Sequence, residues 1–410
     1  MKTLVLQGDG FAGAPSPECG DKTPLQVAET PNLDFLAQHG EYGVLTFPNE
    51  GPALTGDTLH LALLGYEPKK YYTGPGPFVG LSLEVTLGPQ DVAFVCSLVT
   101  LGSSSGRVET KKLSSQVILL DDTAGGIDTE EARDLIDAIN EQLGSESIQF
   151  YAGNGHRHLM VWVGGKGRLT CCDPHIVVGQ EVGPYLPKGD GAQVITELME
   201  AARVVLRSHP INLEREEAGM KPANGIWLWG PGKAVALPKA MERYGVKGAT
   251  LSWSDLHAGI GLSVGFDAIS IPREQKSEEY PYAQVAQTAI ELLGKYDMVY
   301  LHLQEQPDPR EGYLKEKVRR LESFDRHLVG PLLTGLSKME AVRWLVVCNP
   351  WGEPLSPSDH RPTPYVFYDR STAHPAQPSA RYTEVDALAS PYGAKEALRL
   401  AERLRPNRKA

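Results

Sequence analysis

The sequence predicts an α/β protein with a doubly wound, largely parallel sheet and a smaller inserted α+β domain. The first observation is that strand-type and helix-type segments alternate along residues 237–347, which is the order of βα units around a parallel sheet. The second is an apolar first strand, Lys2–Leu6, that leads to Asp9. Buried parallel strands carry ligands at their carboxyl ends. The third is a stretch of short strands and turns between residues 81 and 179.

Composition limits the size of the fold and the classes of partner. The chain has 410 residues, of which 41% are hydrophobic and 22% are charged, enough for one large or two ordinary domains with packed cores. The formal net charge of -11 disfavours nucleic acid and anionic membranes as partners, since both are bound through an excess of Lys and Arg. No apolar run reaches the roughly 18 residues of a membrane span or resembles a signal peptide, so we expect a cytoplasmic protein.

The first elements carry local signals. Asp9 directly follows the first strand and is a candidate ligand, although an aspartate before Gly10 is also a common turn residue. A helix is expected next, with Thr30 as its N-cap and Pro31 at its first position. Gly40 then supplies the stop signal.

Residues 81–179 are expected to form the inserted α+β domain, and residues 1–80 and 180–410 the core domain. A helix begins after Asp128, because acidic residues favour helix N-termini. We expect the main sheet to resume at Pro222–Gly230. The strands expected in the inserted domain are Leu81–Leu87, Val92–Leu101, Ile148–Tyr151 and Leu159–Val163.

The carboxyl-terminal half supplies the remaining βα units of the core. The expected strands are Gly248–Ser252, Ala268–Ile271, Met298–Leu303, Ala341–Val347 and Pro364–Tyr368. The expected helices are Leu237–Tyr244, one ending at Val264, Tyr282–Leu293, Tyr313–Thr334 and Ala394–Leu404.

Residues 51–78 read as an active-site segment, because turn residues, a short helix and an aromatic Gly-Pro loop flank Asp57 and His60. The segment resembles that of the archaeal-type 2,3-bisphosphoglycerate-independent phosphoglycerate mutases of the alkaline phosphatase superfamily. In that family Gly-Ser-Asp-Thr-Ala-His-Leu precedes Leu-Gly-Tyr-Asp-Pro and Tyr-Tyr-Thr-Gly-Arg-Gly-Pro-Phe. The resemblance extends over residues 2–368 and implies an alkaline-phosphatase-like fold. The family's nucleophilic serine falls on Gly56, and its loop arginine falls on Pro75.

The resemblance also implies two divalent metal ions, manganese or zinc, that activate the nucleophile and hold the phosphoryl oxygens. Among the family's ligand positions, Asp9 and His360 keep the residue type, as vestiges of the two sites. The family's Asp-His pair near the last strand falls on Asn349-Pro350, and Asp308 and Glu311 are weak substitutes in the remaining ligand segment. We therefore predict no cofactor for a non-catalytic chain, and a divalent metal only if the chain is an active enzyme.

Most cationic positions of the family are lost, which weakens binding of a phosphorylated acid by roughly 1.5–3 kcal/mol for each charge-assisted bond. The replacements are Pro75, Asp122, Thr123, Trp229, Ala258, Leu262 and Gln304. The family's polar positions in and after the inserted domain are kept and are expected to line a cleft: Arg157, His158, Asp173 and His175.

Several of these residues have an equally simple structural interpretation. Asp57 fits a helix N-terminal cap, His60 a buried core imidazole, and Asp173 and His175 turn residues. Thr55, next to the lost serine position, is a weak candidate nucleophile, because a shift of one residue at a strand-to-helix turn points the side chain elsewhere.

Three functions are compatible with this pattern. The first is a phosphoglycerate mutase-like protein that is catalytically degenerate or functionally changed. The second is an active mutase, or a metal-dependent phosphatase, that uses substitute ligands. The third is a non-catalytic scaffold subunit that pairs with an active paralogue. The partners compatible with the sequence are such a paralogue or a second copy of this chain in a homo-oligomer. With Trp229 and Leu262 in place of cationic residues, the cleft is expected to bind a small organic ligand or a protein segment.

Overall fold

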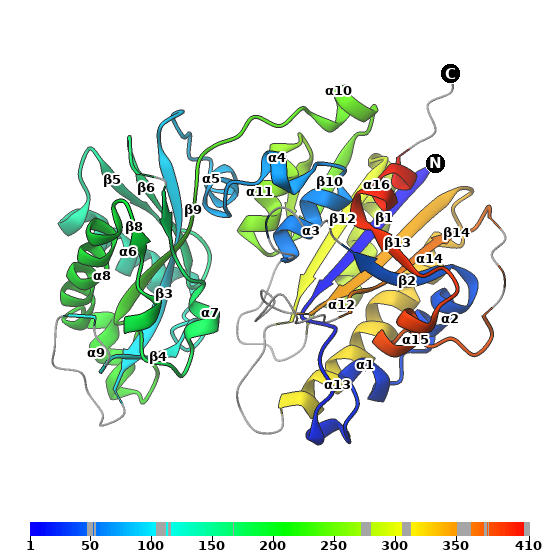
Figure 1. Ribbon diagram of the computed structural model, residues 1–410, viewed down its shortest axis with the longest axis horizontal. Coiled ribbons are helices and arrows are strands. Elements are labelled where there is room, and N and C mark those ends of the chain that lie inside the picture. Colours follow the sequence, from blue (N-terminus) through cyan, green and yellow to red (C-terminus); the bar gives the residue numbers. More distant parts are fainter. Residues whose placement is uncertain are drawn as a thin grey trace. The chain divides into compact units, whose positions relative to one another are not determined.

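The computed structural model describes residues 1–46, 52, 55–103, 112–113, 116–166, 168–271, 280–305, 313–350, 362–372, 375 and 377–405. The chain divides into two compact units, each with its own sheet and its own hydrophobic core (Figure 1). Unit 1 comprises Met1–Tyr72 and Leu237–Ala410, and unit 2 comprises Thr73–Ala236.

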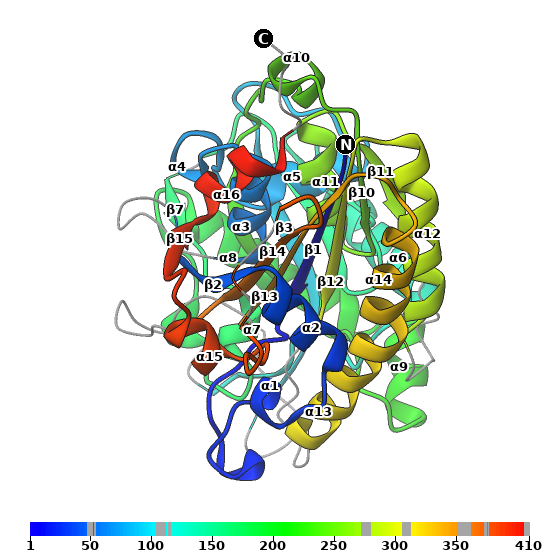
Figure 2. The same ribbon diagram turned by 90° about the vertical axis from the view of Figure 1, so that its right-hand side faces the viewer.

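Unit 1 is built on an eight-stranded sheet with strand order β11-β10-β12-β1-β13-β14-β2-β15 (Figure 2). The strands from β11 to β13 are parallel, whereas β14 runs antiparallel to both of its neighbours. The predicted doubly wound, largely parallel sheet is therefore confirmed. The strand bounds are β1 Lys2–Asp9, β2 Glu41–Thr46, β10 Gly248–Ser252, β11 Asp267–Ser270, β12 Met298–Gln304, β13 Val342–Asn349, β14 Pro364–Asp369 and β15 Ala394–Glu396.

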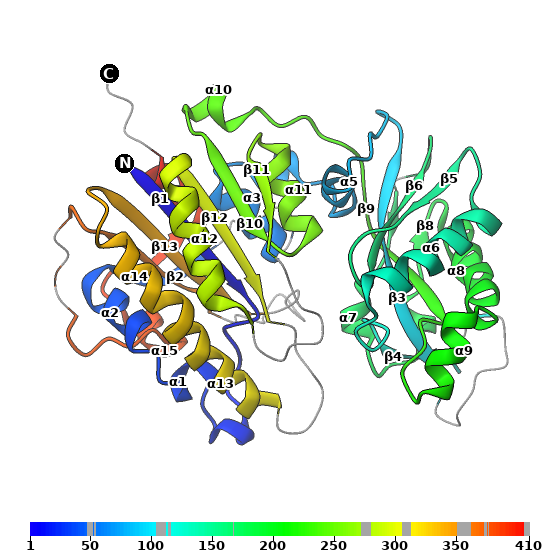
Figure 3. The ribbon, with the colours of Figure 1, turned by 180° about the vertical axis from the view of Figure 1, so that it is seen from behind.

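Helices cover both faces of this sheet. On one face, α2 and α12–α14 pack on the apolar side chains of the central strands (Figure 3). On the other, α11 contacts β10 and α3. The helix bounds are α1 Pro24–Val27, α2 Pro31–His39, α3 Gly56–Leu63, α4 Pro68–Tyr71, α10 Ala240–Tyr244, α11 Asp255–Ser263, α12 Tyr282–Lys295, α13 Tyr313–Phe324, α14 Gly330–Leu336, α15 Glu384–Ala389 and α16 Ala397–Leu404.

The central strands have one apolar and one polar face towards their carboxyl ends. Leu4 and Leu6 of β1 belong to the main core, so Gln7 and Asp9, which alternate with them, lie on the opposite face. In the parallel register His302 of β12 is the partner of Gln7, which places it on that face as well. Buried polar side chains thus gather at one strand end, where α/β proteins place their ligands.

Unit 2 is an antiparallel sheet in which β3 pairs with β4, β6 and β9, and β6 also pairs with β5. Helices α6 and α8 supply its core together with β3 and β9. The element bounds are α5 Gly76–Ser82, β3 Val92–Gly102, β4 Ile118–Asp121, α6 Thr129–Leu143, β5 Ile148–Tyr151, β6 Arg157–Trp162, β7 Leu169–Thr170, α7 Pro174–Val177, β8 Lys188–Gly189, α8 Ala192–Arg207, α9 Pro210–Glu217 and β9 Gly225–Gly232.

The division of the chain differs from the predicted one. Residues 180–236, expected in the core domain, belong to unit 2, because β9 pairs with β3 instead of resuming the main sheet. The apolar residues of α8 and β9 complete the core of unit 2. The boundary on the amino-terminal side also moves, from residue 80 to Tyr72.

Some predicted elements change type at their ends. Residues 81–87, expected as a strand, contain the end of α5 and a turn. The helix expected over residues 394–404 begins only at Ala397, because residues 394–396 form β15 beside β2. The helix expected over residues 313–334 is interrupted by a π-helical turn at Asp325–Val329. Among the described residues, no helix is both long and apolar enough to cross a membrane.

Candidate functional site

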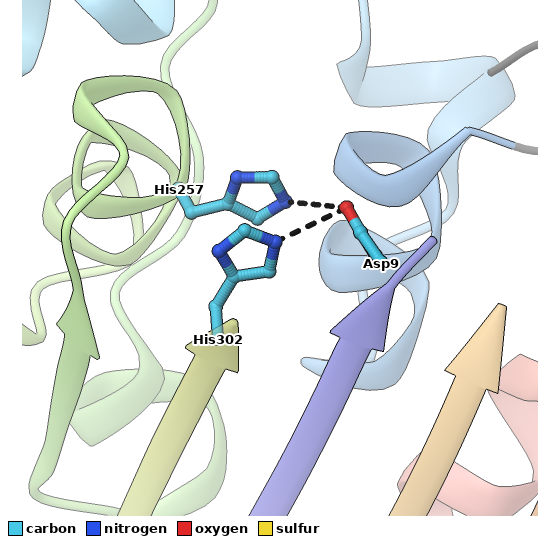
Figure 4. Close-up of side chains that lie close together, drawn as sticks. All are labelled: Asp9, His257 and His302. Atoms are coloured by element: carbon cyan, nitrogen blue, oxygen red, sulfur yellow. Dashed lines mark hydrogen bonds and ion pairs between the residues drawn. The ribbon is translucent and has the colours of Figure 1, made fainter. Parts of the chain in front are cut away.

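The polar strand end of unit 1 brings together one carboxylate and two imidazoles (Figure 4). Asp9 is the last residue of β1, His302 lies near the end of β12, and His257 lies in the first turn of α11, the helix that follows β10. Because β10, β12 and β1 are adjacent parallel strands, their carboxyl ends meet at one edge. We call these three residues the strand-end cluster.

Both imidazoles of the strand-end cluster face the same carboxylate oxygen. Nε2 of His302 lies 3.1 Å from Oδ2 of Asp9, and Nε2 of His257 lies 3.6 Å from it. The two rings stack with centroids 3.3 Å apart and planes 9° from parallel. All three side chains are buried, and their ligand atoms lie within 4.8 Å of one another. Two imidazole nitrogens and one carboxylate oxygen are a donor set that suits zinc and related ions.

A second layer of hydrogen bonds holds the cluster in place. Nδ1 of His302 lies 3.1 Å from Oγ of Ser252, and Nδ1 of His257 lies 3.2 Å from Oγ of Ser254. The side-chain amide of Gln7 donates to Oδ1 of Asp9 at 2.6 Å. Each ring therefore uses Nδ1 for a serine and turns Nε2 towards Asp9. Orientation by such outer partners is typical of metal-binding histidines.

The charges within the strand-end cluster determine how Asp9 titrates. Burial alone would raise the pKa of the Asp9 carboxyl, but the nearby imidazoles of His302 and His257 and the amide of Gln7 hold its pKa below the ordinary value. Asp9 is therefore a carboxylate near neutral pH, the form that binds a cation.

Gly56, at the position of the expected nucleophile, contacts Asp9. A Cβ atom added to Gly56 would lie 2.5 Å from Cγ of Asp9 and nearer still to Oδ2, whereas real Cβ atoms do not approach other heavy atoms within 3.0 Å. The Gln7 side chain also links the two residues, because its amide donates to the Gly56 carbonyl at 2.8 Å. The Asp9 carboxylate thus fills the space in which a serine side chain would begin.

Asp57 and Thr55 serve the start of α3. Asp57 is buried and accepts hydrogen bonds from the hydroxyls of Thr55 and Tyr72 and from the Thr58 amide. Burial raises the pKa of Asp57, and these hydrogen bonds oppose that shift. The Thr55 hydroxyl also lies 3.1 Å from that of Thr58. The N-cap of α3 is Thr55 and not Asp57 as predicted; Asp57 lies in the first turn, and these contacts occupy the Thr55 hydroxyl at the start of the helix.

His60 packs beside the cluster as a core residue. It is fully buried, and its ring stacks on Tyr300 with centroids 3.7 Å apart. Neither ring nitrogen has a hydrogen-bond partner among the residues that the structure describes. Burial, and to a lesser extent the neighbouring His257 and His302, lowers the pKa of His60 well below its ordinary value, so the ring is neutral.

The metal pair implied by the family resemblance does not fit the described residues. Asp9 is in place, but Gly56 offers no side-chain donor, and Asn349-Pro350 supplies an amide and an imino acid where the family has Asp and His. The other candidate ligands, Asp308, Glu311 and His360, lie outside the described residues. The described residues suit one ion, through Asp9 and two histidines at positions that are not the family's ligand positions.

The candidate residues of unit 2 form a separate polar group. Asp173 caps α7 by accepting from the His175 amide at 2.9 Å, and Nδ1 of His175 lies 3.2 Å from Oδ2 of Asp122. Burial alone would raise the pKa of Asp122, but the imidazole of His175 and, to a lesser extent, His156 and Arg157 of β6 hold its pKa below the ordinary value. We call Asp122, Arg157, Asp173 and His175 the turn cluster.

His158 and Trp229 are parts of the unit 2 sheet. His158 is fully buried, and its Nδ1 accepts from the Gly153 amide at 3.0 Å. Burial lowers the pKa of His158 to about 3. The indole of Trp229 donates to Oγ of Ser97 on β3 at 3.0 Å. Both side chains thus have local structural partners inside unit 2.

The sequence did not single out His257 and His302 as site residues. A usable signal was present, since each histidine lies at or just after the end of an apolar strand that the sequence predicts, as Asp9 does. Sequence spacing could not show that β12 lies between β10 and β1, and this strand order brings the three side chains together.

Comparisons with known proteins agree with the resemblance. The family profile of 2,3-bisphosphoglycerate-independent phosphoglycerate mutase matches residues 37–212. A probable 2,3-bisphosphoglycerate-independent phosphoglycerate mutase of Geobacter sulfurreducens is 38% identical over 98% of this chain and 99% of its own length. The enzyme named 2,3-bisphosphoglycerate-independent phosphoglycerate mutase 2 of Methanothermobacter thermautotrophicus is 37% identical over 98% of this chain and 96% of its own.

Solved structures share the fold. A Pyrococcus horikoshii protein matches with a TM-score of 0.68 at 24% identity, covering 98% of this chain and 96% of its own. The cofactor-independent phosphoglycerate mutase of Thermoplasma acidophilum matches with a TM-score of 0.54 at 25% identity, covering 98% of both chains. The alkaline-phosphatase-like α/β fold, the family profile and the full-length relatives agree: the chain belongs to the archaeal-type 2,3-bisphosphoglycerate-independent phosphoglycerate mutase family.

Proposed function

We propose that this chain is a functionally changed member of the mutase family that does not interconvert phosphoglycerates through a phosphorylated side chain at position 56. The observation that carries the proposal is the contact between Gly56 and Asp9. A glycine has no hydroxyl to phosphorylate, and the Asp9 carboxylate fills the space that a side chain at this position would need. A covalent route through this position is therefore closed.

The surroundings of Gly56 support the same conclusion. Catalysis of phosphoryl transfer depends on cations that neutralise the transferred group. Gln304, at the family's lysine position, is the register partner of Asp9 on one side, and Asn349 is its partner on the other. Both are neutral amides. Asp9, Gln304 and Asn349 therefore carry one negative charge and no positive charge at the strand end of unit 1.

A second candidate function is an active mutase, or a metal-dependent phosphatase, with substitute residues. The specific observation in its favour is that relatives 36–38% identical over at least 90% of this chain carry the mutase name. In this case Thr55 is the nearest alternative nucleophile, and Asp308 and Glu311 would be substitute ligands. A scaffold role, in which the chain pairs with an active paralogue or with a second copy of itself, is one way in which the function can have changed.

An enolase-coupled assay separates the two candidates. We expect the full-length protein, supplied with manganese or zinc and 3-phosphoglycerate, to turn over below roughly 0.01 s⁻¹, against the 1–10³ s⁻¹ typical of enzymes. The positive control is the Methanothermobacter thermautotrophicus relative in the same buffer. Gly56→Ser should not gain activity, because the hydroxyl would arrive with a clash against Asp9. Turnover by the wild type that Thr55→Ala abolishes would overturn the proposal and establish the second candidate.

A further inference from the structure

We propose that the strand-end cluster binds a single divalent transition-metal ion of the zinc class, through Oδ2 of Asp9 and Nε2 of His257 and His302. This inference does not depend on the proposed function. It also differs from the metal pair of the family resemblance, with which it shares Asp9 alone. Three protein ligands leave one position of a tetrahedral ion for water or a ligand.

The two separations from the Asp9 oxygen match the spacing of ligand atoms around such an ion. Zinc bonds of about 2.0–2.1 Å in tetrahedral geometry separate neighbouring ligand atoms by about 3.3 Å. The observed separations from Oδ2 of Asp9 are 3.1 Å to His302 and 3.6 Å to His257. These two oxygen-to-nitrogen separations therefore need to change by only a few tenths of an ångström on metal binding, whereas the stacked rings must tilt so that both Nε2 lone pairs point at the ion.

The hydrogen bonds around the cluster prepare each ligand atom. Ser252 and Ser254 occupy the Nδ1 atoms of His302 and His257, so both Nε2 atoms remain on the side of Asp9. Gln7 occupies Oδ1 of Asp9 and leaves Oδ2 as the atom that the histidines face. Outer-shell hydrogen bonds of this kind orient the ligands in metal sites.

The loss of the serine side chain and the presence of this site are linked in space. The missing Cβ at Gly56 makes room for Oδ2 of Asp9 in its present position. A serine at position 56 would displace the carboxylate from the line of the two imidazoles. The glycine that removes the family's nucleophile is thus also what allows Asp9 to meet His257 and His302.

A metal-free arrangement of the strand-end cluster competes with the proposed one, with protons on the Nε2 atoms in place of the ion. Both imidazoles could carry a proton on Nε2 and donate to Asp9, while Nδ1 of each accepts from its serine hydroxyl. That arrangement uses the same heavy-atom distances, but it predicts no metal binding. The two arrangements are therefore distinguished by metal content and not by geometry.

The test is titration of chelator-treated full-length protein with Zn²⁺ by calorimetry, and with Co²⁺ by visible absorption. We expect one equivalent of either ion, and Co²⁺ bands typical of a four-coordinate site. His257→Gln and His302→Gln should each weaken Zn²⁺ binding by at least about 100-fold. The outer-shell variants Ser252→Ala and Ser254→Ala should weaken it about 10- to 100-fold, which keeps the test decisive if the histidine variants do not fold.

His60→Gln is the matched control, because His60 is a buried imidazole whose ring centroid lies 5.4 Å from that of His257 but which is not in the cluster. We expect this variant to bind Zn²⁺ like the wild type. Failure of the wild type to bind Zn²⁺ and Co²⁺ would overturn the site. So would two equivalents of equal affinity, unchanged binding in the histidine and serine variants, or loss of binding in His60→Gln. None of these outcomes depends on mutase activity, so the site and the proposed function can fail separately.

Discussion

The strand-end cluster of unit 1 and the turn cluster of unit 2 contain the same kinds of residue but use them differently. In the strand-end cluster two Nε2 atoms face a single carboxylate oxygen, and all three side chains are buried. In the turn cluster Asp173 caps the helix that carries His175, and His175 contacts Asp122 from another part of unit 2 with side chains 27% and 21% exposed.

This difference shows which polar group is arranged for a ligand. A carboxylate oxygen that accepts from its own helix already serves the fold, whereas ligand atoms that converge from separate elements leave a place for an ion. The family resemblance drew attention to Arg157, Asp173 and His175 of the turn cluster but to only Asp9 of the strand-end cluster. The contacts favour the strand-end cluster as the site and the turn cluster as part of the scaffold.

The largest effect on stability that we predict comes from placing a methyl group between Gly56 and Asp9. Gly56→Ala should lower the free energy of unfolding by about 1–3 kcal/mol, because the new Cβ overlaps the buried carboxylate. The matched control is Gly294→Ala in α12, where no atom lies within 4 Å of the added Cβ. That variant should gain about 0.5–1 kcal/mol, the usual preference for alanine in a helix. Urea unfolding measures both.

A double variant identifies the cause of the Gly56 effect. If the Asp9 carboxylate is the obstacle, Asp9→Ala should remove most of the penalty of Gly56→Ala, with a coupling energy of at least about 1 kcal/mol. Additive effects would mean that some other feature of the α3 start disfavours alanine. They would also remove the spatial link between the missing serine and the strand-end cluster.

The second effect is an acid-dependent loss of stability from His158 in unit 2. Its pKa of about 3 in the folded protein lies below the roughly 6.5 of an unfolded chain, so the unfolded state binds more protons between these values. Its contribution is therefore complete above pH 6.5 and is lost as the pH falls, by about 2 kcal/mol at pH 5.

His158→Gln removes this titrating group, so its free energy of unfolding should fall less steeply between pH 8 and pH 5 than that of the wild type. Chemical denaturation at a series of pH values gives the two slopes. Parallel slopes would show that the folded protein admits a proton at His158 without cost. The burial of His158 in unit 2 would then have no effect on stability.

The smallest effect is expected at the ion pair of the turn cluster. A double-mutant cycle of Asp122→Asn and His175→Gln should give a coupling energy of about 0.2–1 kcal/mol, because both side chains are partly exposed. The coupling should shrink further in 1 M salt, since the screening length falls to about 3 Å. A coupling above about 2 kcal/mol that resists salt would mean that the turn cluster is a buried, organised site like the strand-end cluster.

Local patterns predicted the elements of this protein well. The apolar run before Asp9, the Pro31 and Gly40 signals of α2 and the Asp128 cap of α6 all depend on residues close in sequence, and the structure has these elements where they were expected. Alternation along β1 also determines, without any tertiary information, that Gln7 and Asp9 share one face of a strand. The fold class follows from such patterns together with the order of the elements.

Which strands pair, and which side chains meet at their ends, was decided only by the tertiary structure. The sequence placed residues 222–230 in the main sheet, but a strand has no local signal for its partner, and β9 pairs with β3 because the two bury a shared core in unit 2. The same holds for the site. Asp9, His257 and His302 come from three strand ends that become neighbours through the strand order, and Gly56 reaches Asp9 only when α3 packs on that edge. Convergence of donor atoms is a non-local property, which is why residue type alone identified Asp9 but not its partners.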